Sequence, residues 1–351
     1  MTITDPWLGA RAPRWQVQLL DRFDAPKDTL RFMDGSAKIA TFARLGGNAR
    51  LVLSAEDVQD VNWFSDRISI TYYPRGLNGP SYPVGIYLFD SPLENRGMAS
   101  AFTVDLMTKV AIIDQDQITE TYSLPQGSQI IPAVVDLIES TGETRIAVTD
   151  SDVVTSSALT YEAGESKLTI INDLLTSADY SSLWSDGTGQ FRVEPYQNPL
   201  ARPVAFEFVE GETSIHKPEW SREQDVLNVP NRVMVVSPGS DDEPAIIGIA
   251  EDNDPNSPYS IPSRGRVIGR TEEVSDMTSV SAANSYAQRL LEGGMSPQAT
   301  LAVEHAIVPL EPGDLVRFTS GGQERMATIR EMTFDLDYGS QCRSLWREVS
   351  G

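Results

Sequence analysis

The sequence is poor in the residues that most often carry out chemistry. It has one cysteine, Cys342, and two histidines, His216 and His305, among 351 residues. A single cysteine excludes an internal disulfide and a metal site built on several thiolates, so we expect Cys342 to be a small buried or half-buried residue rather than a nucleophile. His305 lies in a segment with strand periodicity, where we expect a structural histidine. His216 lies in a polar link, where we expect exposure to solvent.

Sequence signals for membranes, secretion and nucleotides are also missing. No run of about 18 apolar residues is present, so we expect no membrane-spanning helix. The N-terminus lacks the basic flank and apolar run of a secretion signal. There is no Gly-x-Ser-x-Gly elbow for a serine nucleophile, and Gly187-x-Gly189 joins two expected strands instead of opening a helix, unlike a dinucleotide fingerprint. We expect no catalytic residue and no cofactor-binding residue.

One acidic segment begins like a calcium-binding loop. Asp252, Asp254 and Asn256 have the spacing of the first three ligands of such a loop. The sixth position, however, is Ser257 where glycine is needed, and the twelfth is Ser263 where a bidentate glutamate is needed. We expect an acidic surface loop here and no metal site.

Negative charge is what the chain has in excess. It has 50 acidic against 28 basic side chains, a net charge of −22. Such a surface repels nucleic-acid phosphates and anionic lipid, which argues against a sequence-reading DNA or RNA binder and against membrane binding. Hydrophobic residues make up 40% of the chain and aromatic residues 8%, enough for buried cores. The length predicts two or three domains.

Short alternating segments predict a β-rich first domain. Phe64–Tyr73 alternates polar and apolar residues, Pro83–Asp90 is rich in β-branched and aromatic residues, and the chain breaks between them at Gly79-Pro80. Further strand-like segments are Arg14–Leu20, Ser36–Phe42, Arg50–Ser54 and Ala99–Met107. After an N-terminal arm of residues 1–13, we expect a barrel or sandwich over residues 14–119.

The pattern changes in the middle of the chain. Gln129–Ser140 predicts a helix that ends at Thr141-Gly142. A second expected helix follows Ser166, and its apolar residues fall on one face. A hairpin with a glycine-bearing loop follows between Leu183 and Tyr196. We expect a small α+β module over residues 120–215.

The last third returns to strands around one helix. An acidic turn at 239–243 separates two strand-like segments, and Glu251–Pro262 predicts a polar loop. Val280–Leu291 carries an apolar stripe at helical spacing and ends before Gly293-Gly294. The expected strands are Asn231–Ser237, Ala245–Ala250, Ala299–Val308, Leu315–Thr319 and Met326–Asp335. We expect a second barrel over residues 216–351, with a helical insert at about 239–295.

The order of these segments resembles a known family. The segments that carry the likeness are Pro83–Pro92 (PVGIYLFDSP), Ala158–Tyr196, Asp225–Val236, Pro258–Arg266, Ala282–Leu291 and Leu310–Val316. They are similar to the minor tail proteins of long-tailed phages of actinobacteria, within the baseplate-hub family. The resemblance implies a mainly β fold with an α+β insert, in which two tube-like β-barrel domains are joined by a small module. It also implies a homotrimer that closes the tail tube and joins sixfold tube symmetry to threefold tip proteins.

The resemblance implies partners and a location as well. The expected partners are a distal tail protein or the tail tube above and tip or receptor-binding proteins below, with the tape measure protein and passing DNA in the lumen. The expected location is the tail tip of the virion, assembled in the host cytoplasm without membrane insertion. An acidic channel wall would hold few phosphates, so DNA could slide past. Some relatives carry a fused lysozyme or peptidase domain, for which we expect no room here, and this favours a structural, non-enzymatic role.

Two other functions stay open at this point. The chain could be a β-rich polysaccharide or cell-wall hydrolase, which would show two carboxylates about 5–10 Å apart in a cleft. It could also be a receptor- or carbohydrate-binding module of the tail tip, with exposed tryptophan and tyrosine residues in one groove. A hub should instead show hydrophobic lateral surfaces and assemble by symmetry.

Overall fold

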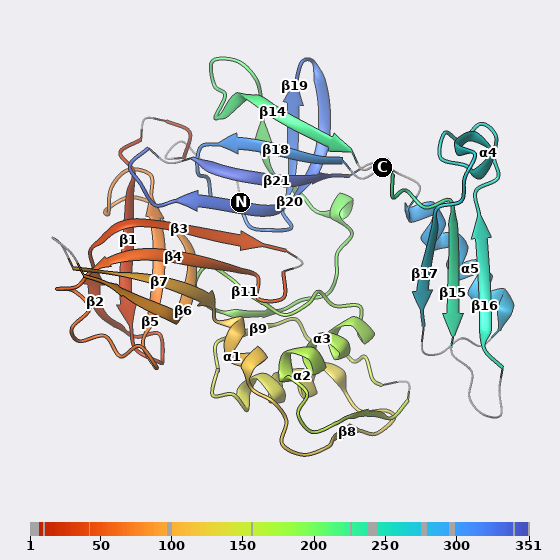
Figure 1. The fold of residues 1–351 in the computed structure, drawn as a ribbon, viewed down its shortest axis with the longest axis horizontal. Helices are drawn as coiled ribbons and strands as arrows, with labels where there is room; N and C mark the ends of the chain where they lie inside the picture. The colour runs from red at the N-terminus through yellow and green to blue at the C-terminus, as the bar shows by residue number, and fades with distance from the viewer. Residues whose placement is uncertain are drawn as a thin grey trace. The chain divides into compact units, whose positions relative to one another are not determined.

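The computed structural model describes residues 7–9, 11–41, 43–96, 100–155, 157–224, 227–237, 244–274, 279–294, 299–339 and 341–349. These residues belong to two compact units, and Figure 1 labels most of their strands and helices. Unit 1 consists of Met1–Trp220 with Ala302–Trp346, and unit 2 consists of Ser221–Leu301 with Arg347–Gly351. Segments far apart in the sequence therefore build each unit.

Unit 1 is organised around a large, mostly antiparallel sheet. The strands from the first third of the chain are β1 (Arg14–Leu20), β2 (Pro26–Leu30), β3 (Phe32–Ala40), β4 (Gly47–Ser54), β5 (Arg67–Tyr73), β6 (Tyr82–Asn95) and β7 (Ala101–Thr108). They lie in the order β3-β4-β7-β6-β5-β1-β2, and neighbouring strands are antiparallel. Side-chain alternation brings Ile68, Ile70 and Tyr72 of β5 to the buried face.

Strands from the end of the chain continue the same sheet. They are β13 (Val204–Phe208), β14 (His216–Gln224), β18 (Ala299–His305), β19 (Leu315–Ser320), β20 (Gln323–Asp335) and β21 (Cys342–Glu348). Strand β20 connects the two sets, because its first half pairs with β19 and its residues 331–335 pair with β3. The path through the sheet ends at β14 and at β2, so the described strands form no closed barrel.

The prediction of a mainly β fold with an α+β insert is confirmed. Strands expected in two separate barrels share one hydrogen-bonded sheet, because β20 pairs with both β19 and β3. Strand β5 begins at Arg67 rather than Phe64, because Asn62–Asp66 forms a turn closed by hydrogen bonds of 2.9 Å in both directions. The boundaries expected at residues 14, 120 and 216 stay a prediction, and residues 1–6 of the expected N-terminal arm lie outside the described residues.

The central part of unit 1, residues 110–201, is here called the module. Its elements are α1 (Val110–Gln115), β8 (Tyr122–Leu124), α2 (Ile130–Glu139), β9 (Ile146–Val148), β10 (Leu159–Tyr161), α3 (Lys167–Ser177), β11 (Trp184–Ser185), β12 (Phe191–Val193) and the 3-10 turn Pro199–Ala201. Both predicted helices and the predicted hairpin are present. Strand β8 pairs with β10, and β12 lies between β11 and β9.

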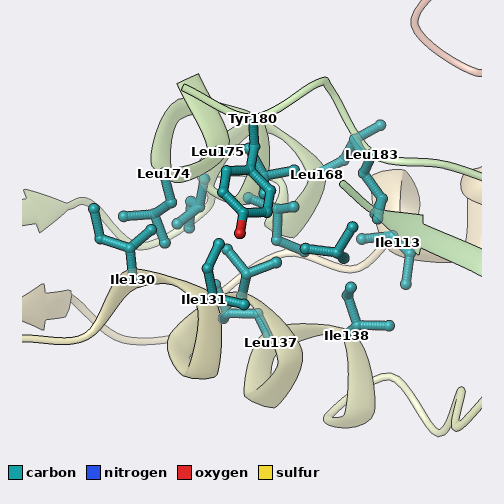
Figure 2. Close-up of a cluster of buried hydrophobic side chains, with 14 of the residues drawn as sticks. Ile113, Ile130, Ile131, Leu137, Ile138, Leu168, Leu174, Leu175, Tyr180 and Leu183 are labelled. Carbon is teal, nitrogen blue, oxygen red and sulfur yellow. The ribbon is translucent and has the colours of Figure 1, made fainter. Parts of the chain in front are cut away.

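The module has a hydrophobic core of its own. Figure 2 shows Ile131 and Leu137 of α2 facing Leu168 and Leu175 of α3, with the Tyr180 ring between the helices. The expected apolar face of α3 is buried, because its leucine and isoleucine side chains recur at helical spacing. The Tyr180 hydroxyl donates to the Thr149 carbonyl at 2.7 Å, which satisfies its polar end inside this core.

Unit 2 is a small layer of sheet and helix. Its elements are β15 (Arg232–Ser237), β16 (Ile246–Glu251), α4 (Ile261–Arg264), β17 (Gly269–Glu273) and α5 (Val280–Gly294). Strand β15 is central, antiparallel to β16 and parallel to β17. Helix α5, predicted as Val280–Leu291, packs on one face of this sheet through Ala283, Ala287 and Leu291. A Cβ at Gly248 would lie 2.3 Å from the Ala283 carbonyl carbon, so glycine permits this close approach. The acidic turn expected at 239–243 lies outside the described residues.

Candidate functional site

A histidine, a serine and the single cysteine meet inside unit 1. His305 Nε2 lies 2.8 Å from the Ser344 Oγ, and the Cys342 Sγ lies 3.2 Å from the same oxygen. The His305 Nδ1–H donates to the Ala306 carbonyl at 2.9 Å, so in the neutral ring Nε2 accepts the Ser344 proton. This hydrogen-bonding pattern is also that of a catalytic base and its nucleophile.

Complete burial makes this cluster unsuited to catalysis. His305 and Cys342 are 0% exposed and Ser344 is 2% exposed. Burial lowers the pKa of His305 to about 4 and raises the pKa of Cys342 to about 12, so both side chains are neutral near pH 7. A general base needs a pKa near the working pH and contact with substrate. The cluster is a neutral part of the core, as expected for His305 and Cys342.

The expectation that His216 is exposed to solvent is wrong. The residue is 8% exposed, and its ring lies edge-on to Phe318 with the ring centroids 5.1 Å apart. The reason is that His216 opens strand β14 instead of belonging to a loop, and the strand turns its first side chain toward the aromatic core. Its Nδ1 lies 2.8 Å from the Lys217 carbonyl.

The calcium-like segment is a hydrogen-bonded turn. The Asp252 carboxylate accepts from the Asp254 N–H at 3.0 Å and from the Ser257 hydroxyl at 2.6 Å. The Asp254 carboxylate accepts from the Asn256 N–H at 2.9 Å. These carboxylates hold the backbone of an Asx turn. Across the described ranges, no group of three or more His, Cys, Asp or Glu residues is arranged to hold a metal ion.

The most unusual polar arrangement in unit 1 is a closed ring of four charged side chains, here called the ion ring. Lys109 Nζ lies 2.7 Å from Asp24 Oδ2 and 2.8 Å from Glu143 Oε2. Arg67 lies 2.7 Å from Asp24 Oδ1 and 2.5 Å from Glu143 Oε1. The ring is buried from solvent, since the four side chains are between 0% and 9% exposed. Each carboxylate oxygen therefore faces a different cation contact, and the four charges sum to zero.

The ion ring shifts the pKa values of two of its members, Asp24 and Arg67, toward their charged forms. Burial alone would raise the pKa of Asp24, but hydrogen bonds and charge from Lys109 and Arg67 lower it below its ordinary value. Burial alone would lower the pKa of Arg67, but Asp24 and Glu143 raise it. Arg145, at 45% exposure, adds a contact of 3.3 Å to Asp24 at the rim. Asp24 and Arg67 therefore stay charged at neutral pH.

The ion ring lies where the module meets the large sheet. Asp24 belongs to the β1–β2 turn, Arg67 begins β5, Lys109 joins β7 to α1, and Glu143 follows α2. The third N–H of Lys109 donates to the Gly189 carbonyl at 3.1 Å, in the hairpin loop between β11 and β12. No sequence pattern predicted the ring. Its one local signal is a lysine inside the apolar run Leu106–Ile113.

Glycines of that hairpin loop dock directly onto strand β6. A Cβ at Gly187 would lie 1.9 Å from the Pro83 carbonyl oxygen, and a Cβ at Gly189 would lie 2.7 Å from Ile86 Cδ1. Gly189 also takes a φ of 78°, which favours glycine. The Gly187-x-Gly189 segment thus serves contact between the module and the sheet, and both glycines are needed for the close approach.

The sheet of unit 2 has an apolar face that α5 does not cover. Val233, Val235 and Ala250 face the helix, so their neighbours in sequence project from the other side. That side carries Met234 opposite Ile249 and Val236 opposite Ile247, here called the outer face. Ile247 and Ile249 are 45% and 51% exposed. An Arg232–Glu251 ion pair of 2.6 Å borders the face at one end.

Negative charge is concentrated in the module. Residues 110–200 contain 14 acidic and three basic side chains, a net charge of −11 out of −22 for the whole chain. The exposed acidic residues of this segment are Glu120, Asp136, Glu139, Asp150, Asp152, Glu162, Asp173 and Asp179. About a quarter of the chain thus carries half of its net charge, mostly at the surface.

Three solved structures have the same fold over nearly the whole chain. A tail protein from Neisseria meningitidis is 12% identical, covers 95% of this chain and 97% of its own, and has a TM-score of 0.69. The 43 kDa tail protein of prophage MuSo2 from Shewanella oneidensis is 12% identical, with 95% and 98% covered and a TM-score of 0.66. Prophage tail protein gp18 from Listeria monocytogenes is 14% identical, with 94% of each chain covered and a TM-score of 0.55.

Comparisons of sequence give no further relatives. No protein-family model matches the chain, and no curated protein sequence matches it. No helix in the part of the chain that the structure describes has both the length and the apolar character to cross a membrane. At these low identities the likeness concerns the fold, and the chain therefore has the fold of phage tail proteins.

Proposed function

We propose that the protein is a structural hub at the tip of a phage tail. Three copies would close the tail tube and adapt its sixfold symmetry to threefold tip proteins, with a distal tail protein or the tube above and receptor-binding proteins below. The observation that carries the proposal is the likeness of fold to tail proteins over about 95% of both chains. The role is non-enzymatic, and the protein belongs to the virion.

The distribution of charge supports an acidic channel. Half of the net charge belongs to the module, and eight of its acidic residues are exposed. A wall of like charge binds few DNA phosphates, so DNA and the tape measure protein could pass without sequence-specific binding. In a trimer, the three modules would supply this wall.

The outer face of unit 2 supports lateral assembly. Copies with a net charge of −22 repel one another, so stable contacts need a surface with little net charge. The outer face offers four apolar side chains, with the Arg232–Glu251 ion pair at one end and Glu273 of β17 beside Val236. We expect this face to be buried against a neighbouring subunit.

Electron microscopy and light scattering test the hub. We expect the wild-type chain to form trimers when mixed with its neighbouring tail proteins, and to occupy the tail tip in particles. Ile247→Glu with Ile249→Glu should weaken trimer formation, because it places charge on the outer face. Ser281→Glu with Ser285→Glu, on exposed positions of α5, is the matched control with the same charge change. Particles with this chain at any place other than the tip would contradict the hub.

A hydrolase is the second candidate, and Glu311 is the residue that favours it. The Glu311 side chain reaches the surface, but the protein atoms packed around it, followed by the charge of Asp314, raise its pKa to about 7, a value suited to a general acid. Glu311 and Asp314 belong to one tight turn in which the Glu311 N–H donates to the Asp314 carboxylate at 2.9 Å. If the chain is a hydrolase, it should clear purified cell walls and Glu311→Gln should abolish the clearing. We expect neither protein to clear them.

A further inference from the structure

The ion ring joins two parts of unit 1 that each have buried apolar side chains of their own. The module has its own hydrophobic core, built from α1, α2, α3 and the strands next to them. The large sheet has a separate set of buried strands. Asp24, in the β1–β2 turn, and Arg67, in β5, lie on the side of the large sheet, Glu143 belongs to the module, and Lys109 stands at the joint. The ring is thus the buried polar part of this contact, and the ion pair of Arg44 with Asp114 of α1 adds a more exposed one.

Buried ion pairs do not in general stabilise a fold. Each ion loses its hydration, and the attraction within a buried pair often only offsets that loss. An apolar contact of the same volume would hold the two bodies equally well. What the ring adds is geometry, because an apolar contact tolerates sliding while this one does not. The three donors of Lys109 meet Asp24, Glu143 and the Gly189 carbonyl within 3.1 Å, and a rotation of the module would break several of these bonds together.

The glycine contact acts on the same joint through the hairpin loop between β11 and β12. Gly187 and Gly189 allow the loop to touch Pro83 and Ile86 of β6, and the Gly189 carbonyl is also a ligand of Lys109. A tilt of the module that lifted this loop would remove an acceptor from a fully buried ammonium group. The steric contact and the ion ring are therefore satisfied in one and the same orientation.

We propose that the ion ring of Asp24, Arg67, Lys109 and Glu143 is an orientation lock that sets a single angle between the module and the large sheet. Without it, the module stays folded on its own core but takes more than one orientation. The lock belongs to the single chain and does not rest on the proposed hub. In a symmetric assembly it would give every copy the same shape.

Distance measurements between spin labels test the lock in the full chain. Labels at Asn48→Cys in β4 and Glu162→Cys in the module are both at exposed positions, and Cys342 is fully buried and escapes labelling. With the ring intact, we expect one narrow distance distribution. The variant Lys109→Met with Glu143→Gln removes one charge of each sign. It should retain the circular dichroism of the wild type and show a distribution split into more than one maximum. Arg50→Met with Asp105→Asn removes an exposed pair of β4 and β7 and should leave the distribution unchanged.

Every outcome of this experiment decides the proposal. A single narrow distribution in the folded double variant would show that apolar and glycine contacts alone set the angle, and the lock would be wrong. If the double variant does not fold, Glu143→Gln alone, which keeps an acceptor for Arg67, should fold and broaden the distribution. Failure of both variants to fold would mean that the ring serves stability, again against the proposal. Because the measurement uses the isolated chain, a failed trimer test would not alter it.

Discussion

Two buried polar clusters of unit 1 differ in charge: one keeps paired charges and the other is neutral. The ion ring keeps four charges and compensates each with partners from distant parts of the chain. The His305–Ser344–Cys342 cluster carries no charge, because burial moves the pKa values of His305 and Cys342 away from neutrality. A side chain at 0% exposure thus has two ways to avoid an isolated charge, and the choice decides how pH and mutation affect it.

Removing one member of the ion ring should cause the largest loss of stability. Lys109→Met leaves Asp24 and Glu143 buried with fewer cations, and we expect a loss of about 3–5 kcal/mol in the free energy of unfolding. Urea denaturation measures it. Arg50→Met, which breaks an exposed ion pair, should change the free energy by less than about 1 kcal/mol. Equal effects of the two substitutions would mean that the ring is solvated.

The neutral cluster should make stability depend on pH between the ordinary pKa of histidine and the lowered pKa of His305. The pKa of His305 is lowered from 6.5 to about 4 in the folded state, so the unfolded chain binds a proton first as the pH falls. The stabilisation from this residue is full above pH 6.5 and is lost between 6.5 and about 4, on the order of 3 kcal/mol. His305→Gln should lose less stability over this range. Parallel pH profiles for wild type and the His305 variant would contradict the lowered pKa of His305. The pKa of Asp24 is lowered from 3.8, so the stabilisation from Asp24 is lost only below pH 3.8.

Two buried tyrosines of strand β6 allow the same kind of comparison, with a smaller expected change in stability. The Tyr82 hydroxyl donates to the Leu310 carbonyl at 2.6 Å, whereas the Tyr87 hydroxyl, also buried, has no hydrogen-bond partner among the described residues. Tyr82→Phe leaves a carbonyl unsatisfied and should cost about 1 kcal/mol, while Tyr87→Phe removes an unsatisfied hydroxyl and should gain about as much. Thermal or urea unfolding measures both. A loss with Tyr87→Phe would reveal a partner for its hydroxyl, such as a buried water.

Substitution of Glu311 should have the smallest effect on stability, and its pH dependence should have the opposite sign to that of His305. Its side chain reaches the surface, but the protein atoms packed around it, followed by the charge of Asp314, raise its pKa to about 7. A carboxyl with a raised pKa contributes stability below its ordinary pKa of 4.5 that is lost as the pH rises through 7. Glu311→Gln should therefore flatten the decline in stability between pH 5 and 8. An unchanged profile would mean that the carboxyl is fully hydrated.

Sequence patterns predicted many of the elements that bury one face, but they missed β21, whose side chains alternate between buried and exposed, and the strands that bury few side chains. Strand β5 and helices α2, α3 and α5 alternate or repeat apolar residues with the period of their structure. Strands β2 and β14 lie at the two ends of the sheet path with most side chains exposed, so no alternation marks them.

The polar clusters were harder to predict, because their members are distant in the sequence. Arg67 and Glu143 are 76 positions apart, and Lys109 and Asp24 are 85 positions apart. The chain pattern carries no signal for such pairs, apart from a lysine among apolar residues. His216 was misplaced for a similar reason, since only the pairing of β14 with β18 shows that its ring points inward.

The most direct test of the hub is a cryo-electron-microscopy map of the assembled tail tip. We predict a ring of three copies in which the outer faces of unit 2 are buried between subunits and the exposed carboxylates of the module line the channel. A chain that occurs there as a monomer, or whose module faces outward while basic residues line the lumen, would contradict the account.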